Sequence, residues 1–294
     1  WFCVKEYKNI FLGNIFMNGI ITCKIQGGLG NQLFQIFAVM SYAFKHNWQF
    51  VFPYSDTLPG HEGPRYTAWN SFLKQLKQYT SANEIFKEIG SKVGEFPVYI
   101  EPHFHFRELP AIPNYKFLKI DGYFQSYLYF QESYDKIKQI IRISEQQTEV
   151  CNENKSLFNS QYTISMHFRL GDYKKLQHCH PLMPYEYYFH ALKHILSNIK
   201  DIPVQVLYFC EEKDNELVSP IIKKLSLKFD GVLFTKAPDK IPDWKQMLLM
   251  SCCDSHIIAN SSFSWWGAYF NEKTNKHVCY PGLWFGPGLA NKNL

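Results

Sequence analysis

The second half of this chain alternates regularly between short apolar runs and longer amphipathic segments. Runs of β-branched and aromatic residues predict strands, and apolar residues at every third or fourth position predict helices. Such alternation favours an α/β fold with a parallel, doubly wound sheet, because each crossover helix returns the chain to the same end of the sheet. The predicted strands are 162–168, 204–210, 232–235, 256–259 and 277–280, and the predicted helices are 184–199, 215–226, 242–252 and 264–271.

The first half begins with a similar strand and helix and then becomes less regular. A strand at 20–26 leads through the turn Gly27-Gly-Leu-Gly30 into a helix over 31–44. The polar run 144–160 predicts a boundary between an N-terminal domain, 1–155, and a C-terminal domain, 156–294. Other elements predicted before this boundary are strands at 49–53 and 115–123 and helices near 69–79 and 128–141.

Composition excludes several classes of protein. A hydrophobic content of 46% and a charged content of 19% are typical of a globular chain rather than a disordered one. The net charge of +5 comes from scattered Lys and Arg, which argues against a nucleic-acid partner. The sequence contains no apolar run long enough to span a membrane. Because the chain begins at Trp1 rather than Met, we expect it to be joined to further domains in a longer chain.

The eight cysteines form neither a zinc pattern nor a disulfide framework. Cys179 lies between His178 and His180, but no second ligand pair completes a metal site, so we interpret this segment as a polar loop. The absence of a disulfide framework favours a cytoplasmic location, and the Golgi lumen is the alternative if an upstream anchor exists. Two glycosylation sequons begin at Asn154 and Asn260.

Polar residues gather where the predicted strands end. His167, Arg169 and Asp172 follow the strand 162–168, and right-handed crossovers would bring them close to 211–212 and 260–264. An arginine can bind two oxygens of a diphosphate, a histidine can bind a base or sugar, and an aspartate can orient a donor or accept a proton. The alternative is that Arg169 and Asp172 form an ordinary surface ion pair.

The turn before the helix 31–44 is a second candidate site. Gly28 and Gly30 would let a ligand approach the backbone, and the amino end of the helix is electropositive. The spacing of the glycines matches neither a dinucleotide fingerprint nor a P-loop.

Three segments together closely resemble the motifs of the α-1,2-fucosyltransferase family, in the same order and spacing. They are Gly27-Gly-Leu-Gly-Asn-Gln-Leu-Phe-Gln35, His167-Phe-Arg-Leu-Gly-Asp-Tyr173 and Asn260-Ser-Ser-Phe-Ser-Trp-Trp-Gly-Ala268. The segments 121–126 and 280–285 also resemble the family, so the resemblance extends over nearly the whole chain from Ile20. It implies a GT-B-like fold of two Rossmann-like domains, GDP-fucose as donor, inversion at the anomeric carbon, and no metal or other cofactor.

The resemblance also implies roles for individual residues. Arg169 would bind the β-phosphate and His167 the guanine or ribose, while Ser262 and Ser264 would donate to the diphosphate. For the two serines, the alternative is an ordinary helix cap. Glu211 and Glu212 stand where related enzymes carry two aspartates that contact guanine, and the alternative for them is a solvated loop.

The catalytic residues implied are Arg169, Asp172 and Asn31. Asn31 would face donor and acceptor, with a helix cap as the alternative. Asp172 is the best-placed base, unless it only holds Arg169 or Tyr173. Glu186 and His178 are distant alternatives for the base, and Trp265 and Trp266 are expected to pack between sheet and helix.

We therefore expect a glycosyltransferase that moves L-fucose from GDP-fucose to the 2-hydroxyl of a galactose-terminated glycan. The N-terminal domain would lie on the acceptor side and the C-terminal domain would bind the GDP-sugar. Two alternatives are open: a fucosyltransferase acting on another sugar or on a protein hydroxyl, and a non-catalytic module that binds a nucleotide sugar.

Overall fold

The computed structural model describes residues 18–60, 63–111, 116–159, 162–199 and 202–292. The chain forms two compact units. Among the described residues, the first comprises 18–26, Gln32–Pro59 and Arg65–Ile141; the second comprises the segment Gly27–Asn31, residues 60, 63 and 64, and residues 142–292. Cys3 and Tyr115, which the predictions above include, lie outside the described residues.

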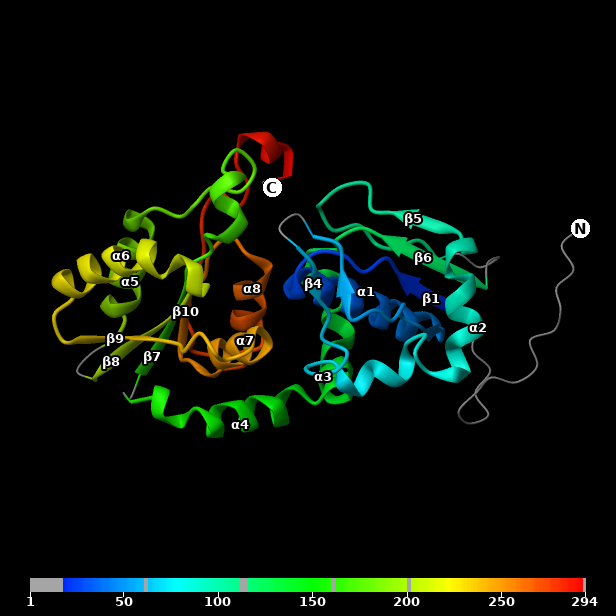
Figure 1. Cartoon of the computed structure of the whole chain (residues 1–294), viewed down its shortest axis with the longest axis horizontal. Helices are drawn as coiled ribbons and strands as arrows, with labels where there is room; N and C mark the ends of the chain where they lie inside the picture. Colours follow the sequence, from blue (N-terminus) through cyan, green and yellow to red (C-terminus); the bar gives the residue numbers. More distant parts are fainter. Residues whose placement is uncertain (1–17, 61–62, 112–115, 160–161, 200–201, 293–294) are drawn as a thin grey trace, which may run out of the picture. The chain divides into compact units, whose positions relative to one another are not determined.

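The first unit contains a parallel sheet with strand order β2-β1-β6-β5 (Figure 1). Its long helix α1 is apolar on most of its circumference, and accordingly most of its residues are buried. The strands are β1 (Ile20–Cys23), β2 (Gln49–Phe50), β5 (Val98–Ile100) and β6 (Phe117–Asp121), and the helices are α1 (Leu29–His46), α2 (Glu84–Lys92) and α3 (Tyr134–Ile141). A separate antiparallel pair is made by β3 (Thr57–Leu58) and β4 (Arg65–Tyr66).

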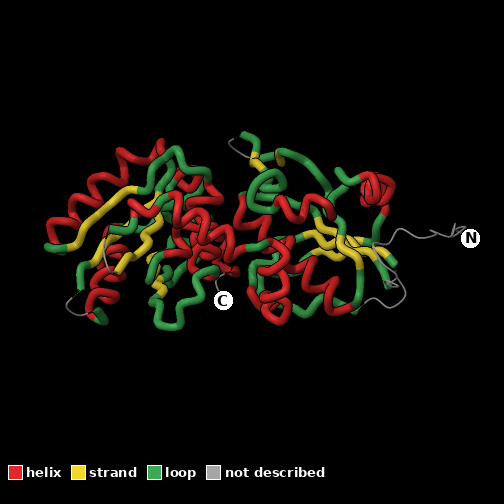
Figure 2. The backbone as a smooth tube through the Cα atoms, turned by 90° about the horizontal axis from the view of Figure 1, so that it is seen from below, coloured by secondary structure: helices red, strands yellow, loops and turns green. Residues whose placement is uncertain are grey.

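The second unit contains a five-stranded parallel sheet with strand order β11-β10-β7-β8-β9, and helices flank its strands (Figure 2). Every strand and helix predicted for this half is confirmed, with ends shifted by a few residues. The strands are β7 (Tyr162–His167), β8 (Val204–Phe209), β9 (Val232–Lys236), β10 (Ser255–Ile257) and β11 (Val278–Cys279). The helices are α5 (Tyr185–Ser197), α6 (Asn215–Lys228), α7 (Asp243–Cys252) and α8 (Ser262–Tyr269).

This strand order places a topological switch point between β7 and β10. From β7 the chain moves outward to β8 and β9, and then returns to the other side of β7 to form β10 and β11. In sheets of this kind a ligand crevice opens at the carboxyl ends of the two strands that flank the switch point. A ligand-binding site is therefore expected at the carboxyl ends of β7 and β10.

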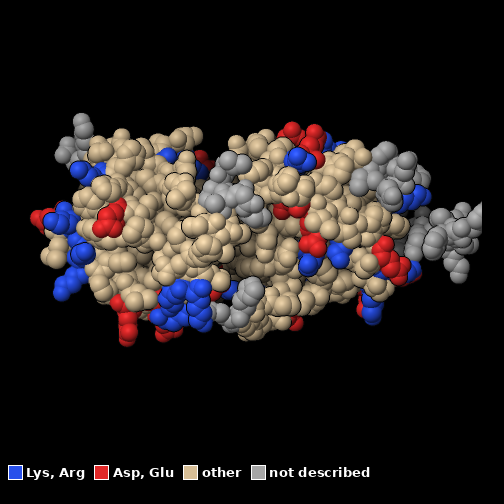
Figure 3. All heavy atoms as spheres, turned by 90° about the horizontal axis from the view of Figure 1, so that it is seen from above, with Lys and Arg blue, Asp and Glu red and all other residues tan. Residues whose placement is uncertain are grey.

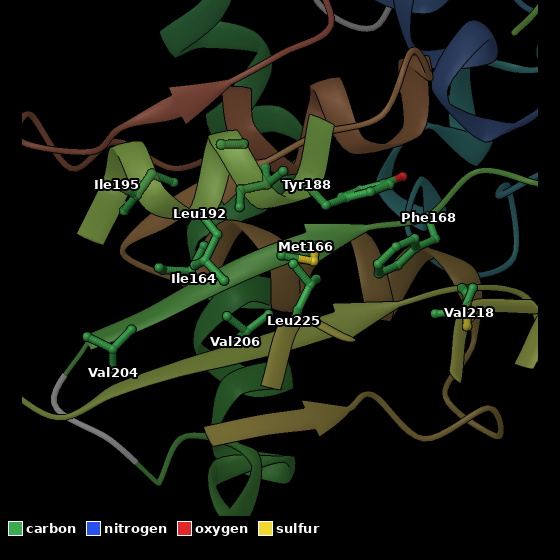
Figure 4. Packing of buried hydrophobic residues seen from close by; sticks show 13 residues of the cluster. Ile164, Met166, Phe168, Tyr188, Leu192, Ile195, Val204, Val206, Val218 and Leu225 are labelled. Carbon is green, nitrogen blue, oxygen red and sulfur yellow. The ribbon is translucent and has the colours of Figure 1, made fainter. Parts of the chain in front are cut away.

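The core of the second unit holds β7 in position (Figure 4). Ile164, Met166 and Phe168 are fully or almost fully buried, and they pack against α5 and β8. The Phe168 ring lies 4.2 Å from the Tyr188 ring, measured between centroids. Each buried side chain of this size contributes about 1.5–3 kcal/mol to the stability of the folded protein. This packing fixes the end of β7, where His167 and Arg169 lie.

The polar run 144–160, predicted to be a boundary, instead contains helix α4 (Ile143–Glu153). Its few apolar residues share one face, where Ile143 and Val150 are buried, and the Gln147 amide donates to Phe270 O at 3.0 Å. Packing on one narrow face thus outweighed the polar composition. The compact units divide between Ile141 and Arg142, while the domain boundary at 155 and 156 stays a prediction.

Other local predictions for the first half were less accurate. The predicted helix near 69–79 is a 3₁₀ helix over Lys74–Tyr79, and the helix predicted from 128 becomes α-helical at Tyr134. Helix α2 and strand β5 had no prediction.

The surface carries charged side chains of both signs in separate small groups, as the face in Figure 3 shows. None of the helices in the described ranges combines the length and apolar character that crossing a bilayer requires. The seven cysteines that the structure describes are all free thiols.

Candidate active site

The carboxyl ends of β7 and β10 bring two of the sequence motifs together in the second unit. Met166 in β7 pairs with Ile257 in β10, so the residues that follow each strand emerge side by side. His167 ends β7, and Arg169 follows two residues later. After β10 the chain reaches Ser262, where helix α8 begins. The convergence predicted from strand order is therefore present at the switch point.

Arg169 lies between two carboxylates at this edge. Its Nη1 is 2.5 Å from Glu211 Oε1, its Nη2 donates to Asp172 Oδ1, and its side chain is 20% exposed. Burial lowers the pKa of Arg169, whereas the negative charges of Asp172, Glu211 and Asp214 raise it by a larger amount. The net pKa therefore lies above the ordinary value of an arginine. The guanidinium is a permanent, partly buried cation rather than one half of a loose surface pair.

Glu211 and Glu212 follow β8 and differ in their surroundings. Glu211 bridges Arg169 and Lys213, whose Nζ lies 2.9 Å from Glu211 Oε2, and its side chain is 41% exposed. Glu212 is exposed in the 3₁₀ turn Glu212–Asp214. In this structure Glu211 is thus engaged with Arg169, and the guanine-binding roles of both residues stay predictions.

His167 is a neutral, buried imidazole beside Arg169. Its side chain is almost fully buried, and its ring centroid lies 5.6 Å from that of Phe263. Burial, followed by the positive charge of Arg169, lowers the pKa of His167 to about 3. A neutral ring offers one donor and one acceptor, which suits a base or a sugar hydroxyl.

Three buried polar atoms at this edge have no hydrogen-bond partner. They are His167 Nδ1, His180 Nδ1 and Asn260 Oδ1, and they are the only such side-chain atoms in the described part of the second unit. Buried polar atoms are usually paired. Tyr173 connects two of these residues, because its hydroxyl donates to Asn260 O at 3.1 Å and its ring stacks on His180 at 4.6 Å. All three atoms therefore have unused hydrogen-bonding capacity, and two of them belong to residues in contact with Tyr173.

Sequence reasoning did not assign His180 or the side chain of Asn260 to the site. The Asn260 amide nitrogen donates to Pro181 O at 3.0 Å and to Trp284 O at 3.2 Å, and the residue is 1% exposed. A glycan on this sequon is therefore incompatible with the fold. Asn260 is the first residue of the third motif, and this position was a signal that it belongs to the site. Nothing in the sequence of its loop distinguished His180 as a site residue.

The glycine turn lies against the start of α8. A Cβ on Gly30 would be 2.6 Å from the Ser262 carbonyl carbon, while a Cβ on Gly28 would meet nothing within 4 Å. Trp266 Nε1 donates to Gly30 O at 2.8 Å, and Ser262 Oγ donates to Asn31 Oδ1 at 2.6 Å. Gly30 is therefore needed for this close packing, and Gly28 leaves open space.

The two serines of α8 point to different partners. Ser262 faces Asn31, whereas Ser264 is 1% exposed and its hydroxyl bonds within the helix, 3.3 Å from Ser261 O. A contact between the Ser264 hydroxyl and a diphosphate would require this bond to break. The N-cap residue of the helix is Ser261, and its side chain accepts no capping hydrogen bond from the first turn.

The remaining sequence candidates lie in separate surroundings. Glu186 is exposed in the first turn of α5. His178 lies against the backbone of Gly286, which donates to Cys179 O at 2.8 Å. Trp266 is fully buried, which confirms its predicted packing role, and Trp265 stacks on Tyr269 at 4.6 Å.

Two Rossmann-like units, with an arginine at the switch point of the second, define a GT-B-like α/β protein. The sequence profile of glycosyl transferase family 11 matches residues 8–282. The chain therefore belongs to glycosyl transferase family 11, and the resemblance to the fucosyltransferase motifs is confirmed.

Two curated relatives come from Escherichia coli. The O-antigen biosynthesis glycosyltransferase WbnK is 27% identical over 184 residues, which are 58% of this chain and 56% of that protein. An alpha-1,2-colitosyltransferase is 28% identical over 174 residues, 56% of this chain and 55% of that protein. The match thus covers little more than half the length of these relatives.

Solved structures share the fold at low sequence identity. A mutant of FUT1 from Arabidopsis thaliana in complex with GDP has a TM-score of 0.53 at 10% identity and covers 95% of this chain and 74% of that one. POFUT1 in complex with GDP has a TM-score of 0.51 at 12% identity and covers 90% and 99%. These similarities confirm the predicted GT-B-like fold.

Proposed function

We propose that this chain transfers L-fucose from GDP-fucose to the 2-hydroxyl of a galactoside, with inversion and without a metal ion. The observation that carries the proposal is the position of Arg169, a partly buried cation at the switch point of the second sheet. Membership of glycosyl transferase family 11 supports a transferase. The α-1,2 linkage in the name of one relative supports the acceptor position, and the GDP in two proteins of the same fold supports the nucleotide.

Arg169 would stabilise the leaving diphosphate. Negative charge grows on GDP as the sugar bond breaks, and a fixed cation stabilises that charge most strongly in the transition state. Each Nη atom of Arg169 donates one of its two N–H groups to a carboxylate in this structure, so the diphosphate either accepts from the remaining N–H groups or displaces one carboxylate. Glu211, at 41% exposed, is freer to move than Asp172, at 13%. In this proposal the guanidinium supplies the positive charge that a metal ion would otherwise provide.

Asp172 has two roles to be distinguished. As a holding residue it keeps Arg169 in place through the contact with Nη2, and as a base it takes the proton of the acceptor hydroxyl. Asp172→Asn separates the two, because an amide oxygen still accepts from Arg169 but cannot take a proton at neutral pH. A holding role predicts partial activity with an unchanged pH profile, whereas a base predicts a loss of about 10²–10⁴-fold.

A second candidate is the transfer of colitose, since one relative is an alpha-1,2-colitosyltransferase. The roles proposed above for Arg169 and Glu211 concern the nucleotide and therefore apply to either sugar donor. Products formed from fucose and colitose nucleotides with galactose-terminated acceptors decide between the two. Linkage analysis of the product then tests the 1,2 position, and any other linkage contradicts that part of the proposal.

Isothermal titration with GDP, UDP and ADP in the presence of EDTA tests the nucleotide. We expect selective binding of GDP, which Arg169→Ala weakens by about 100-fold to a residual affinity that titration still measures. Arg169→Lys does not restore the wild-type affinity, because lysine lacks the planar fork of donors. Arg142→Ala is the matched control, since Arg142 pairs with Glu145 at 3.3 Å on an exposed surface. A protein that binds no GDP, or an Arg169→Ala variant with full turnover, would contradict the proposal.

A further inference from the structure

The turn that follows Arg169 is anchored by a carboxylate from the segment between β8 and α6. Asp214 is fully buried; its Oδ2 accepts the Gly171 backbone N–H at 2.8 Å, and its Oδ1 accepts from Lys174 Nζ at 2.7 Å. Both oxygens therefore bind the segment that follows β7. Burying a carboxylate is costly unless it is paired, and here the pairing partners lie on either side of Asp172.

The position of Asp214 in the fold makes this contact unusual. It is the N-cap residue of α6, a position where an aspartate commonly accepts a bond from the first turn of its own helix. Asp214 makes no such bond, because its side chain extends to the turn after β7 instead. Helix capping therefore does not explain why an aspartate occupies this position. The hydrogen bond that it accepts from the turn after β7 does.

That turn has little freedom. Gly171 has a φ of +37°, and a Cβ at this position would lie 2.7 Å from Glu211 Oε1. The same turn sets the spacing at which Arg169 and Asp172 form their ion pair. The negative charge of Asp214 also acts on Arg169 itself, in addition to the charges of Asp172 and Glu211.

We propose that Asp214 is a positioning residue that holds the Gly171 turn so that Arg169 points to the diphosphate of the donor. Asp214 touches neither donor nor acceptor in this proposal and acts through Arg169. The inference rests on the proposed function, since it presumes that Arg169 binds a nucleoside diphosphate.

The experiment measures GDP affinity by isothermal titration for the wild type, Asp214→Ala and Asp214→Asn, with thermal melting to establish folding. We expect Asp214→Ala to weaken GDP binding by about tenfold or more, the usual contribution of a hydrogen bond to a charged group. Asp214→Asn should lose less, because its amide oxygen still accepts from Gly171. On an Arg169→Ala background, Asp214→Ala should have no further effect on GDP affinity, a result that a merely structural role does not produce.

Asp254→Ala is the matched control. Asp254 makes the same pair of contacts at the opposite end of β7, with the Thr163 N–H at 2.8 Å and with Lys273 Nζ at 2.6 Å. We expect this variant to lower the melting temperature while GDP affinity stays within about twofold, because distant sites act independently.

The outcomes separate the two proposals. Unchanged GDP affinity in Asp214→Ala, or an equal loss in Asp254→Ala, overturns the positioning role and leaves the proposed function intact. A wild-type protein that binds no GDP overturns the proposed function and the positioning role together. If Asp214→Ala does not fold, Asp214→Asn and Lys174→Met decide by the same criteria, since each removes only part of the anchor.

Discussion

The hydroxyl of Ser262 donates a hydrogen bond to Oδ1 of Asn31 at 2.6 Å, although 231 positions separate the two residues. Asn31 lies in the first turn of α1, within the segment Gly27–Asn31 that groups with the second unit, and Ser262 begins α8. Two of the sequence motifs therefore meet through this hydrogen bond, and the third contacts α8 through His167, whose ring centroid lies 5.6 Å from that of Phe263.

We predict that Asn31 and Ser262 are energetically coupled. Asn31→Ala, Ser262→Ala and the double variant form a cycle, and urea unfolding measures the free energy of each. The expected coupling is about 1 kcal/mol, the usual net contribution of one hydrogen bond. Strictly additive effects would show that this bond does not stabilise the folded protein.

Gly30 and Gly28 should respond differently to alanine. Gly30→Ala places a methyl group against the backbone of α8, 2.7 Å from the Phe263 nitrogen, so we expect a loss of about 1–3 kcal/mol in the free energy of unfolding. Gly28→Ala enters open space and should change that free energy by less than about 0.5 kcal/mol. Thermal or urea unfolding of the pair provides the measurement. Equal destabilisation would refute the close packing of the turn on α8.

Glu211→Gln should increase the affinity for GDP. The variant removes a carboxylate that competes with the diphosphate for Arg169 Nη1, and the side chain is exposed enough to move aside at little cost. We expect a gain of several-fold, about 1 kcal/mol, measured by isothermal titration. A guanine-reading role predicts the reverse: weaker GDP binding and a reduced preference for GDP over UDP. Glu212→Gln, in the next position, is the control.

Stability should decrease as the pH falls below about 6.5, partly because of His256. Burial, followed by Lys276 and Lys273, lowers the pKa of His256 to about 3. Between this pKa and the unfolded value of about 6.5, the unfolded chain binds more protons, so acid favours unfolding.

His256→Gln should therefore reduce the slope of stability against pH in this window, by at most about 1.4 kcal/mol per pH unit. Urea unfolding at several pH values gives that slope. His190→Gln, on the exposed side of α5, is the control. A slope that His256→Gln leaves unchanged would contradict a neutral, buried imidazole.

The fold of the second unit and the location of its site could be predicted because both depend on local patterns. Strands β7 and β8 are apolar runs followed by turn residues, and such patterns can be recognised from residues adjacent in the sequence. Alternating strands and helices then leave few topologies, and these place the strand ends at one edge. The first half was harder to predict, since short elements such as β5 and the 3₁₀ turns carry weak periodicity.

The sequence by itself determined the parallel α/β architecture and the three motifs at the strand ends. Only the tertiary structure decided which side chains engage one another: Glu211 with Arg169, Asp214 with Gly171, and Ser262 rather than Ser264 with Asn31. It also decided that the polar segment α4 is a packed helix. The physical reason is that hydrogen bonds and ion pairs depend on distances of a few ångströms between residues far apart in the chain, which strand order and packing set and local periodicity does not.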